Sequence, residues 1–211
     1  KTKVVYDFRQ EDTLNGGQGA PLAPIFHNLL SNILNMKNQI KYPICFLNIG
    51  GISNITIISN NEDLPNNKIR AFDIGPGNCL IDQWVRKNSN KKYDDTGSIG
   101  QSGIIDKLIL NQAIDNFKID SYNQSLDIND FDISFAKGLS LENGCATITV
   151  FTAYLISKGI EYANSFNKKS QTKYFICGGG RKNKFLIENI KKNLTTYNNI
   201  DLENIDKYDI D

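Results

Sequence analysis

Asp73, at the end of a short apolar segment, is the side chain of this sequence that most invites a chemical explanation. It lies in AFDIGPGN, residues 71–78, where a strand-like run passes into two glycines, a proline and an asparagine. A carboxylate at the mouth of a strand, facing a glycine-rich turn, indicates a functional site more than a structural one. The ordinary alternative is that Asp73 only caps its own turn through nearby backbone N–H groups.

Three glycine-rich turns, each directly after a predicted strand, form the second candidate feature. They are NIGGISN at 48–54, DIGPGN at 73–78 and CGGGRKN at 177–183. Glycines let backbone N–H groups approach a phosphate or a flat ring. Each turn alone is more often a hairpin or a strained turn, but together they match the layout of the actin, hexokinase and chaperone ATPase superfamily. No GxxxxGK[ST] motif occurs, and GGQGAP is not the dinucleotide-binding GxGxxG.

The elements that must position these residues alternate between strands and helices. Apolar runs predict strands, the first of them short, at 3–6, 44–49, 55–58, 69–74 and 172–177. Helical spacing predicts helices from Pro21 to 34, after a cap at Asn78, and at 104–117, 143–166 and 183–194. Residues 121–140 predict a polar loop, and 199–211 predict no further element. Units of this kind place ligands at the carboxyl ends of strands.

Composition excludes several classes of function. The 24 basic and 23 acidic residues give a net charge of +1, which argues against nucleic acid or anionic lipid as a partner. The four cysteines, without a CxxC pair, predict buried thiols in a reducing compartment and argue against zinc. The apolar run 145–157 is too short to span a bilayer, and no signal peptide opens the chain. We therefore expect a cytoplasmic protein with no membrane partner.

Six longer strings resemble successive segments of the anhydro-N-acetylmuramic acid kinase family, in order, from Val4 to about Leu194. They are DFRQEDTLNGGQGAPLAPIFH, LNIGGISNIT, FDIGPGNCLIDQW, SLDINDF, GLSLENGCATITVFTA and CGGGRKN. The resemblance implies an α/β, ribonuclease-H-like sugar kinase fold of the actin superfamily, here as an incomplete two-lobe structure. Residues 1–40 would be the end of an N-terminal lobe with an inter-lobe helix and a sugar-site segment. Residues 41–211 would be the C-terminal ATPase-like lobe.

The resemblance also implies an activity. Members of the family cleave the 1,6-anhydro ring of anhydro-N-acetylmuramic acid with water and phosphorylate the freed O6 from ATP, in peptidoglycan recycling. The implied product is N-acetylmuramic acid 6-phosphate, and the implied partners are the amino sugar and ATP. Mg²⁺ follows from the chemistry, although no set of ligands for it can be read from the sequence.

Site residues follow from the same resemblance. Asp73 would be the general base that takes a proton from the attacking water. The sugar site would contain Arg9, which can clamp the lactyl carboxylate, together with Asp7, Asp12, Gly17, Gln18 and Gly19. The nucleotide site would contain Gly50, Gly51, Asn54, Gly75, Gly77, Asn78, Gly178, Gly179, Gly180 and Asn183. By contrast, His27 and Trp84 are predicted to be structural, and Tyr93, Asp94 and Asp95 to form a solvated loop.

Two departures from the family leave alternatives open. Relatives begin with a GTSxDG hairpin that this sequence lacks, so we expect a C-terminal portion that is inactive in isolation. Gln124 and Ile128 stand where Lys and Arg are expected. One alternative is a non-catalytic remnant that binds only a sugar or a partner protein. Another is a different sugar or acetate-type kinase of the superfamily. Whichever interpretation holds, a separate N-terminal fragment or a second copy of the chain is a further expected partner.

Overall fold

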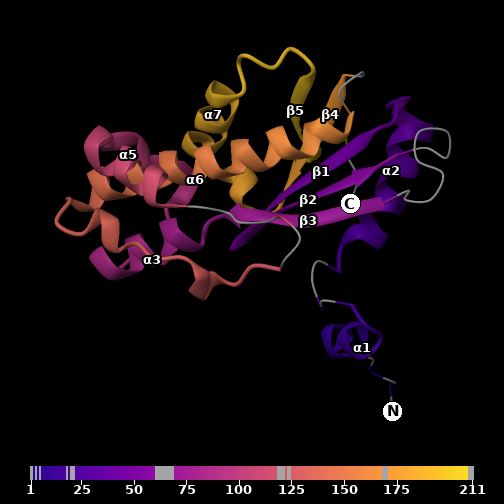
Figure 1. Cartoon of the computed structure of the whole chain (residues 1–211), viewed down its shortest axis with the longest axis horizontal. Helices are drawn as coiled ribbons and strands as arrows, with labels where there is room; N and C mark the ends of the chain where they lie inside the picture. Colours follow the sequence, from indigo (N-terminus) through magenta and orange to yellow (C-terminus); the bar gives the residue numbers. More distant parts are fainter. Residues whose placement is uncertain are drawn as a thin grey trace.

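A five-stranded mixed sheet forms the centre of the computed structural model, which describes residues 2, 4, 6–17, 19, 22–59, 69–117, 122, 125–167 and 171–208. The strands are β1 (Ile44–Ile49), β2 (Ile52–Ile58), β3 (Ile69–Pro76), β4 (Thr172–Cys177) and β5 (Ile200–Asn204). They lie in the order β3-β2-β1-β4-β5 (Figure 1). β1, β2 and β3 form an antiparallel meander, whereas β4 and β5 run parallel to β1 and β4 respectively. This arrangement agrees with the ribonuclease-H-like α/β fold implied by the resemblance.

Both faces of the sheet are covered because its central strands are apolar on both sides. In β1 the side chains of Cys45, Leu47 and Ile49 join the main core, and those of Ile44 and Phe46 join a second, smaller core. Successive side chains of a strand point to opposite faces, so one apolar run supplies two cores.

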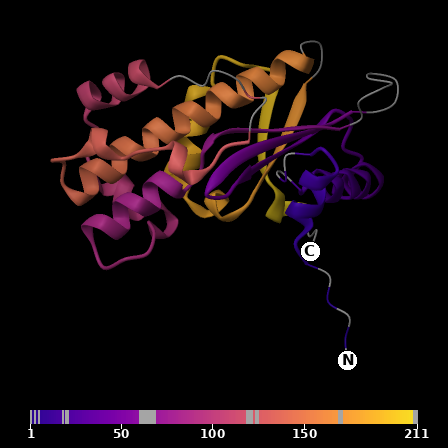
Figure 2. The ribbon, with the colours of Figure 1, turned by 60° about the horizontal axis from the view of Figure 1, so that its bottom comes forward.

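Helices cover the two faces unequally (Figure 2). α2 (Pro24–Asn38) packs on one face through Leu30 and Leu34. On the other side α6 (Leu141–Asn164) packs on β2 and β3. The remaining helices pack against α6, and they are α3 (Cys79–Asn88), α4 (Ser98–Ser102), α5 (Lys107–Asn116) and α7 (Lys184–Asn193). Short 3-10 turns connect them at η1 (Asp95–Gly97), η2 (Ile128–Asp130), η3 (Ser134–Ala136), η4 (Ser165–Asn167), η5 (Gly179–Lys182) and η6 (Ile205–Tyr208).

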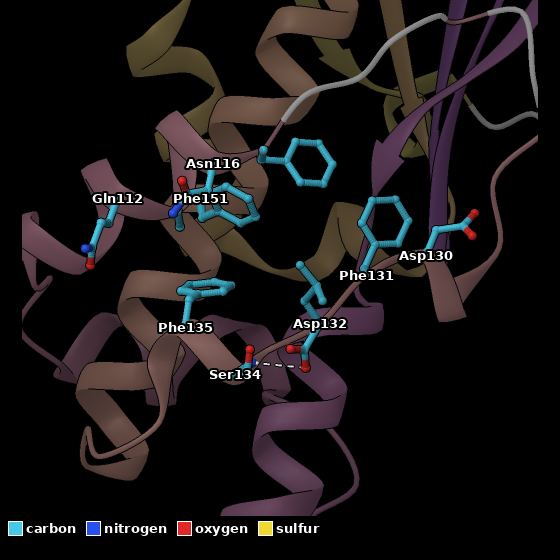
Figure 3. Close-up of a pocket in the computed structure, with 11 residues that line it drawn as sticks. Gln112, Asn116, Asp130, Phe131, Asp132, Ser134, Phe135 and Phe151 are labelled. Atoms are coloured by element: carbon cyan, nitrogen blue, oxygen red, sulfur yellow. Dashed lines mark hydrogen bonds between the residues drawn. The ribbon is translucent and has the colours of Figure 1, made fainter.

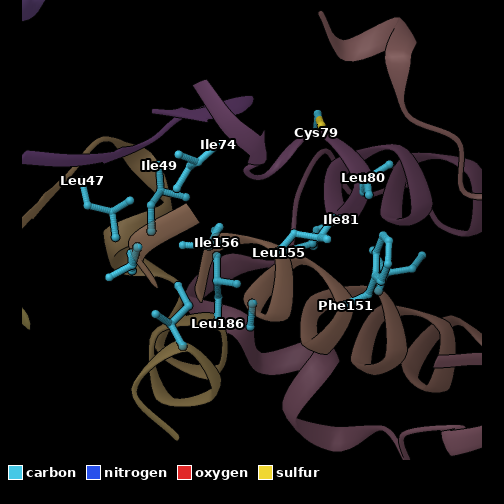
Figure 4. Packing of buried hydrophobic residues seen from close by; sticks show 14 of the residues in the cluster. Leu47, Ile49, Ile74, Cys79, Leu80, Ile81, Phe151, Leu155, Ile156 and Leu186 are labelled. Atoms are coloured by element: carbon cyan, nitrogen blue, oxygen red, sulfur yellow. The ribbon is translucent and has the colours of Figure 1, made fainter. Parts of the chain in front are cut away.

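The long helix α6 organises the main core (Figure 4). Its Ile156 lies among strand residues such as Ile49 and Ile74 and near Leu186 of α7. Two glycines let other elements come close to it. A Cβ on Gly144 would lie 2.1 Å from Trp84 Cζ2, and one on Gly159 would lie 2.4 Å from Ile74 Cβ. The predictions that this helix is buried on most sides and that Trp84 is a core residue are confirmed.

The first residues fold differently from the prediction. Residues 8–14 form helix α1 (Phe8–Leu14), although we predicted a polar segment after a strand at 3–6. Val4 and Tyr6 lie in no strand, and Lys3 and Val5 lie outside the described residues. The sequence FRQEDTL contains Arg, Gln and Glu, which favour helix, so local propensity decides here. The next helix begins at Pro24, whereas Pro21, where we predicted its start, lies outside the described residues.

β5 is an element that we did not predict. Its five residues are all half-buried, and Ile200 and Leu202, which pack against the main core, alternate with Asp201 and Glu203. The alternation of a short half-buried strand is therefore present, and the prediction of no further element here was wrong. Pairing with β4 adds ion pairs across the two strands, because Lys173 Nζ lies 3.6 Å from Asp201 Oδ2 and 3.2 Å from Glu203 Oε1. Other boundaries differ by a few residues: β2 begins at Ile52, α5 at Lys107 and α6 at Leu141.

The state of the cysteines and the character of the helices bear on two expectations, that the thiols are buried and that no segment spans a membrane. All four thiols are free; Cys45, Cys79 and Cys145 are buried and Cys177 is half-buried. Among the helices of the described residues, none has both the length and the apolar character needed to cross a membrane.

Candidate active site

A row of polar side chains crosses three neighbouring strands near one end of the sheet. Asn48 of β1 pairs with Asn54 of β2, and Asn54 pairs with Asp73 of β3. The neighbours of these residues, such as Leu47, Ile55 and Ile74, belong to the main core. Alternation along each strand therefore places the polar row on the opposite face, the one that carries α2.

Asp73 lies at the end of this row in a largely dry environment. Its side chain belongs to a residue that is only 5% exposed, and its Oδ2 accepts a hydrogen bond from the Leu126 N–H at 2.9 Å. Burial raises the pKa of Asp73, and both the Leu126 hydrogen bond and the positive charge of Arg9 partly offset that rise. A carboxylate with a raised pKa is a better proton acceptor than an ordinary surface aspartate.

Asn54 supplies an unused acceptor beside Asp73. Its Oδ1 is buried and has no hydrogen-bond partner among the residues that the structure describes. Because an unpaired buried acceptor is costly, such an atom usually faces a ligand or an ordered water molecule. Asn54 was predicted for the nucleotide site, yet the register places it next to the candidate base.

Two of the three predicted glycine turns are joined directly. The hairpin turn at Gly50 and Gly51 accepts hydrogen bonds from the N–H groups of Gly77, at 2.8 Å, and Asn78, at 2.7 Å. Cys79 N–H donates to the Gly51 carbonyl oxygen at 3.2 Å as well. The first N–H groups of α3 are thus engaged within the protein in this structure.

The cap of α3 differs from the prediction for the same reason. Asn78 occupies the N-cap position, but its side chain makes no capping hydrogen bond. The hairpin carbonyls have taken the place of a side-chain acceptor at this helix end. Gly75 nearby has φ 138°, a conformation that requires glycine at the bend between Asp73 and α3.

The third glycine turn packs against the end of β1. Gly178 has φ 77°, and a Cβ there would lie 2.6 Å from the Ile49 carbonyl oxygen. A Cβ on Gly180 would lie 2.2 Å from Ile49 Cγ2, whereas one on Gly179 would meet no atom within 4 Å. All three predicted turns therefore adjoin the carboxyl end of β1, and Gly179 is the open position of the last turn.

A pocket of about 360 Å³ opens between α3, η1 and η5 and unites three predicted nucleotide-site residues. Its lining comprises Asn78, Ile81, Asp82, Tyr93, Asp94, Asp95, Thr96, Gly179, Lys182 and Asn183. Lys182 brings a positive charge to this wall. Asn183 Oδ1 accepts from the Leu186 N–H at 2.9 Å as the cap of α7. The pocket has the mixture of apolar, glycine and polar groups that small-molecule sites usually have.

Asp94 corrects one prediction about this region. We predicted a solvated loop at Tyr93, Asp94 and Asp95, but Asp94 is buried. Its carboxylate accepts from the N–H groups of Ile99, at 2.8 Å, and Gly100, at 2.9 Å. It thus holds the start of α4 and shapes the pocket wall. Burial raises the pKa of Asp82, and the charge of Asp94 raises it further.

The predicted sugar-site residues gather on α1 and the loop after it. Asp12 Oδ2 accepts from the Gly19 N–H at 2.8 Å, and a Cβ on Gly17 would lie 2.1 Å from the same oxygen. Asp12 therefore closes this loop. Asp7 is exposed with φ 64°, and Gln18 lies outside the described residues. Arg9 is close enough for its charge to lower the pKa of Asp73, which links α1 to the polar row.

A second pocket, of about 520 Å³, was not predicted (Figure 3). Rings of Phe131, Phe135 and Phe151 gather around it, with Gln112 and Asn116 at one side and the Asp132–Ser134 hydrogen bond at another. The complete lining is Leu80, Gln112, Ala113, Asn116, Phe117, Asp130, Phe131, Asp132, Ser134, Phe135 and Phe151. These residues are scattered over 72 positions, so no local pattern could have revealed the pocket.

A magnesium site made of protein side chains alone is not found in the part of the chain that is described. No group of three or more His, Cys, Asp or Glu side chains there could hold a metal ion. Mg²⁺ in phosphoryl-transfer sites is usually held by one or two carboxylates and the substrate phosphates. Asp82, Asp94 and Asp95 line the 360 Å³ pocket, and one or two such carboxylates together with substrate phosphates would suffice.

Comparison with known sequences gives a consistent result. The family model described as anhydro-N-acetylmuramic acid kinase matches residues 1–211. An anhydro-N-acetylmuramic acid kinase of Pelagibacter ubique (strain HTCC1062) is 50% identical over 215 residues, which cover 100% of this chain and 54% of the relative. The kinase of the same name from Rhizobium johnstonii is 38% identical over 185 residues, which cover 87% of this chain and 46% of the relative. The chain thus spans about half the length of these curated relatives.

Among solved structures, an activator of the 2-hydroxyisocaproyl-CoA dehydratase from Clostridium difficile, with bound ADPNP, is similar at a TM-score of 0.45. It shares 16% identity, and the match covers 78% of this chain and 55% of the other.

Proposed function

The chain belongs to the anhydro-N-acetylmuramic acid kinase family, and we propose that it carries the general base and the nucleotide-binding part of such a kinase. The proposed substrates are ATP and 1,6-anhydro-N-acetylmuramic acid. The proposed product is N-acetylmuramic acid 6-phosphate. The proposal covers the assignment of Asp73 as base, of the α1 region to the sugar and of the 360 Å³ pocket to the nucleotide.

The environment of Asp73 is the observation that carries the proposal. Water attacks the anomeric carbon and gives its proton to Asp73, while the bond from that carbon to the bridging oxygen breaks. The electron pair of the bridging oxygen forms the new bond to the γ-phosphorus, and ADP leaves. A buried carboxylate with a raised pKa, fixed at Oδ2 and influenced by Arg9, is suited to accept that proton.

The nucleotide assignment rests on the meeting of the three glycine turns. Gly179 is open to a ligand, Asn78 and Asn183 face the same pocket, and Lys182 supplies a positive charge. Mg²⁺, bound with the phosphates, would neutralise part of their charge during transfer. The protein groups that could contact Mg²⁺ there are the carboxylates of the pocket lining, Asp82, Asp94 and Asp95.

One experiment tests the base assignment in a protein of the family's full length. The chain is joined to the portion of the Pelagibacter ubique relative that precedes the matched region, and sugar-dependent ADP release is measured for the chimera and for the 211-residue chain alone. We expect the chimera to turn over. Asp73→Asn should lower its kcat by about a hundredfold or more with little change in ATP affinity, because Asn keeps the shape but accepts no proton.

Asp115→Asn is a matched control, since Asp115 is exposed on α5 and lies in neither the polar row nor the pocket. Turnover of Asp73→Asn within a few fold of the parent chimera would refute the base assignment. A chimera that binds ATP and sugar but never turns over would instead favour a non-catalytic remnant. If the chimera prefers another sugar in the same assay, the proposed substrate is wrong but the assignment as a kinase stands.

A further inference from the structure

A loop from a distant part of the chain holds the candidate base. Leu126 and Asp73 are 53 positions apart, yet the Leu126 N–H donates to Asp73 Oδ2 at 2.9 Å. No other hydrogen bond between described residues reaches this carboxylate. Asp73 Oδ2 is therefore fixed by the protein, and Oδ1 has no hydrogen-bond partner among the described residues.

Two aspartates give this loop its shape. The Asp127 N–H donates to Asp130 Oδ2 at 2.7 Å, and Asp127 Oδ1 accepts from the Asn129 N–H at 3.0 Å. This reciprocal pair is a capping box around the short turn η2. Leu126 directly precedes the box, so the box holds the peptide unit that follows Leu126.

Side chains of the loop attach it at two further places. Leu126 is half-buried and packs against the main core. A Cβ on Gly51 would lie 3.8 Å from Ile128 Cγ2, so the loop also reaches the hairpin turn between β1 and β2. The same six residues thus connect the candidate base to one of the predicted phosphate-binding turns.

We propose that residues 125–130 are a positioning loop, in which the Asp127–Asp130 box aims the Leu126 N–H at Asp73 Oδ2 and leaves Oδ1 to accept the proton. A carboxylate held through one oxygen keeps a single orientation, which favours proton transfer from a water molecule on the other side. Asp127 and Asp130 are positioning residues, since they touch Asp73 only through Leu126. The catalytic consequence rests on the proposed function, whereas the contact itself does not.

The contact can be tested on the 211-residue chain by ¹⁵N NMR. An amide proton that donates to a carboxylate shifts as the carboxylate titrates, so the Leu126 amide should follow the protonation of Asp73 and should stop doing so in Asp73→Asn. Asp127→Ala should abolish this response. Asp127→Asn, which retains an acceptor for the Asn129 N–H, should restore it. Asp132→Ala is the matched control, because Asp132 accepts from the Ser134 N–H at 3.1 Å in the neighbouring turn η3.

Two results would overturn the proposal. If the Leu126 amide shift does not follow the titration of Asp73, the proposed contact does not exist. If the shift still follows it in Asp127→Ala, the Asp127–Asp130 box does not position the Leu126 N–H. In the active chimera, Asp127→Ala should lower kcat about tenfold while KM for ATP stays unchanged. An unchanged kcat would overturn the catalytic consequence. If the chimera with its native sequence makes no product, the proposed function fails. The NMR response of the 211-residue chain still shows whether the loop positions Asp73.

Discussion

The Asn78 N–H donates to the Gly50 carbonyl oxygen at 2.7 Å, and this bond fastens the turn after β3 to the hairpin between β1 and β2. Gly50 and Asn78 are 28 positions apart in the sequence, yet their turns lie side by side at the end of the sheet. Since Asp73 lies five residues before Asn78, the bond also fixes where the strand that carries the candidate base ends. The architecture of the site therefore depends on the glycines that allow this approach.

Gly77→Ala should destabilise the protein through this contact. A Cβ at position 77 would lie 2.3 Å from the Gly50 carbonyl oxygen, and backbone cannot move aside as a flexible side chain can. We expect a loss of about 1–3 kcal/mol in the free energy of unfolding. Urea denaturation followed by fluorescence of Trp84, the single tryptophan, measures it. Gly179→Ala, where a Cβ meets no atom within 4 Å, is the control and should be close to neutral.

His27 should make stability depend on pH. It is buried, its Nδ1 lies 2.7 Å from Thr56 Oγ1, its ring stacks on Phe46 at 4.7 Å, and burial lowers its pKa to about 4. The unfolded chain binds the proton more readily, so stability is present above pH 6.5 and is lost as the pH falls toward 4. The loss from this residue should approach about 3 kcal/mol at the acid end.

Comparison with His27→Gln isolates this contribution from that of the carboxylates. The difference in unfolding free energy between the native sequence and His27→Gln should shrink steadily between neutral pH and about pH 4. A difference that stays constant over that range would show that His27 titrates normally in the folded protein.

Asp73→Asn should raise stability at neutral pH while it removes activity. The pKa of Asp73 is raised in the folded state, mainly by burial. The stability linked to its protonated form is fully present below the unfolded pKa and is lost as the pH rises through the folded pKa. An asparagine side chain does not titrate, so the variant does not lose this stability as the pH rises. The urea midpoint of Asp73→Asn should therefore exceed that of the native sequence at neutral pH. The two midpoints should converge on acidification, and a lower midpoint for Asp73→Asn at neutral pH would contradict the raised pKa.

Asn183→Ala should weaken the start of α7. Asn183 is 6% exposed, and its Oδ1 accepts from the Leu186 N–H at 2.9 Å. We expect a loss of about 1 kcal/mol, typical of a lost helix cap, and a smaller loss for Asn183→Asp, which keeps an acceptor. Thermal unfolding of both variants measures the difference. Equal losses would show that capping is not what this side chain contributes.

Local sequence determined the elements whose signal lies in their own periodicity. Strand β1 was predicted at 44–49 and found there, because five of its six residues are apolar, which suits a central strand buried on both faces. Helix α6 was predicted because its apolar residues cover most of its circumference. The family could also be predicted, since long, ordered strings carried the resemblance that the comparisons later supported.

Only the tertiary structure decided the contacts between segments far apart in the sequence. Residues 200–203 alternate apolar and polar side chains, but the β4 edge on which β5 pairs and the ion pairs to Lys173 depend on residues outside that segment. The register of three strands brought Asn54 beside Asp73, and folding of a polar loop brought Leu126 to the same carboxylate. Engagement of the α3 N–H groups by the hairpin likewise depends on how two turns meet. Local propensity acts over a few residues, whereas these positions depend on sheet order and core packing, which the whole chain sets at once.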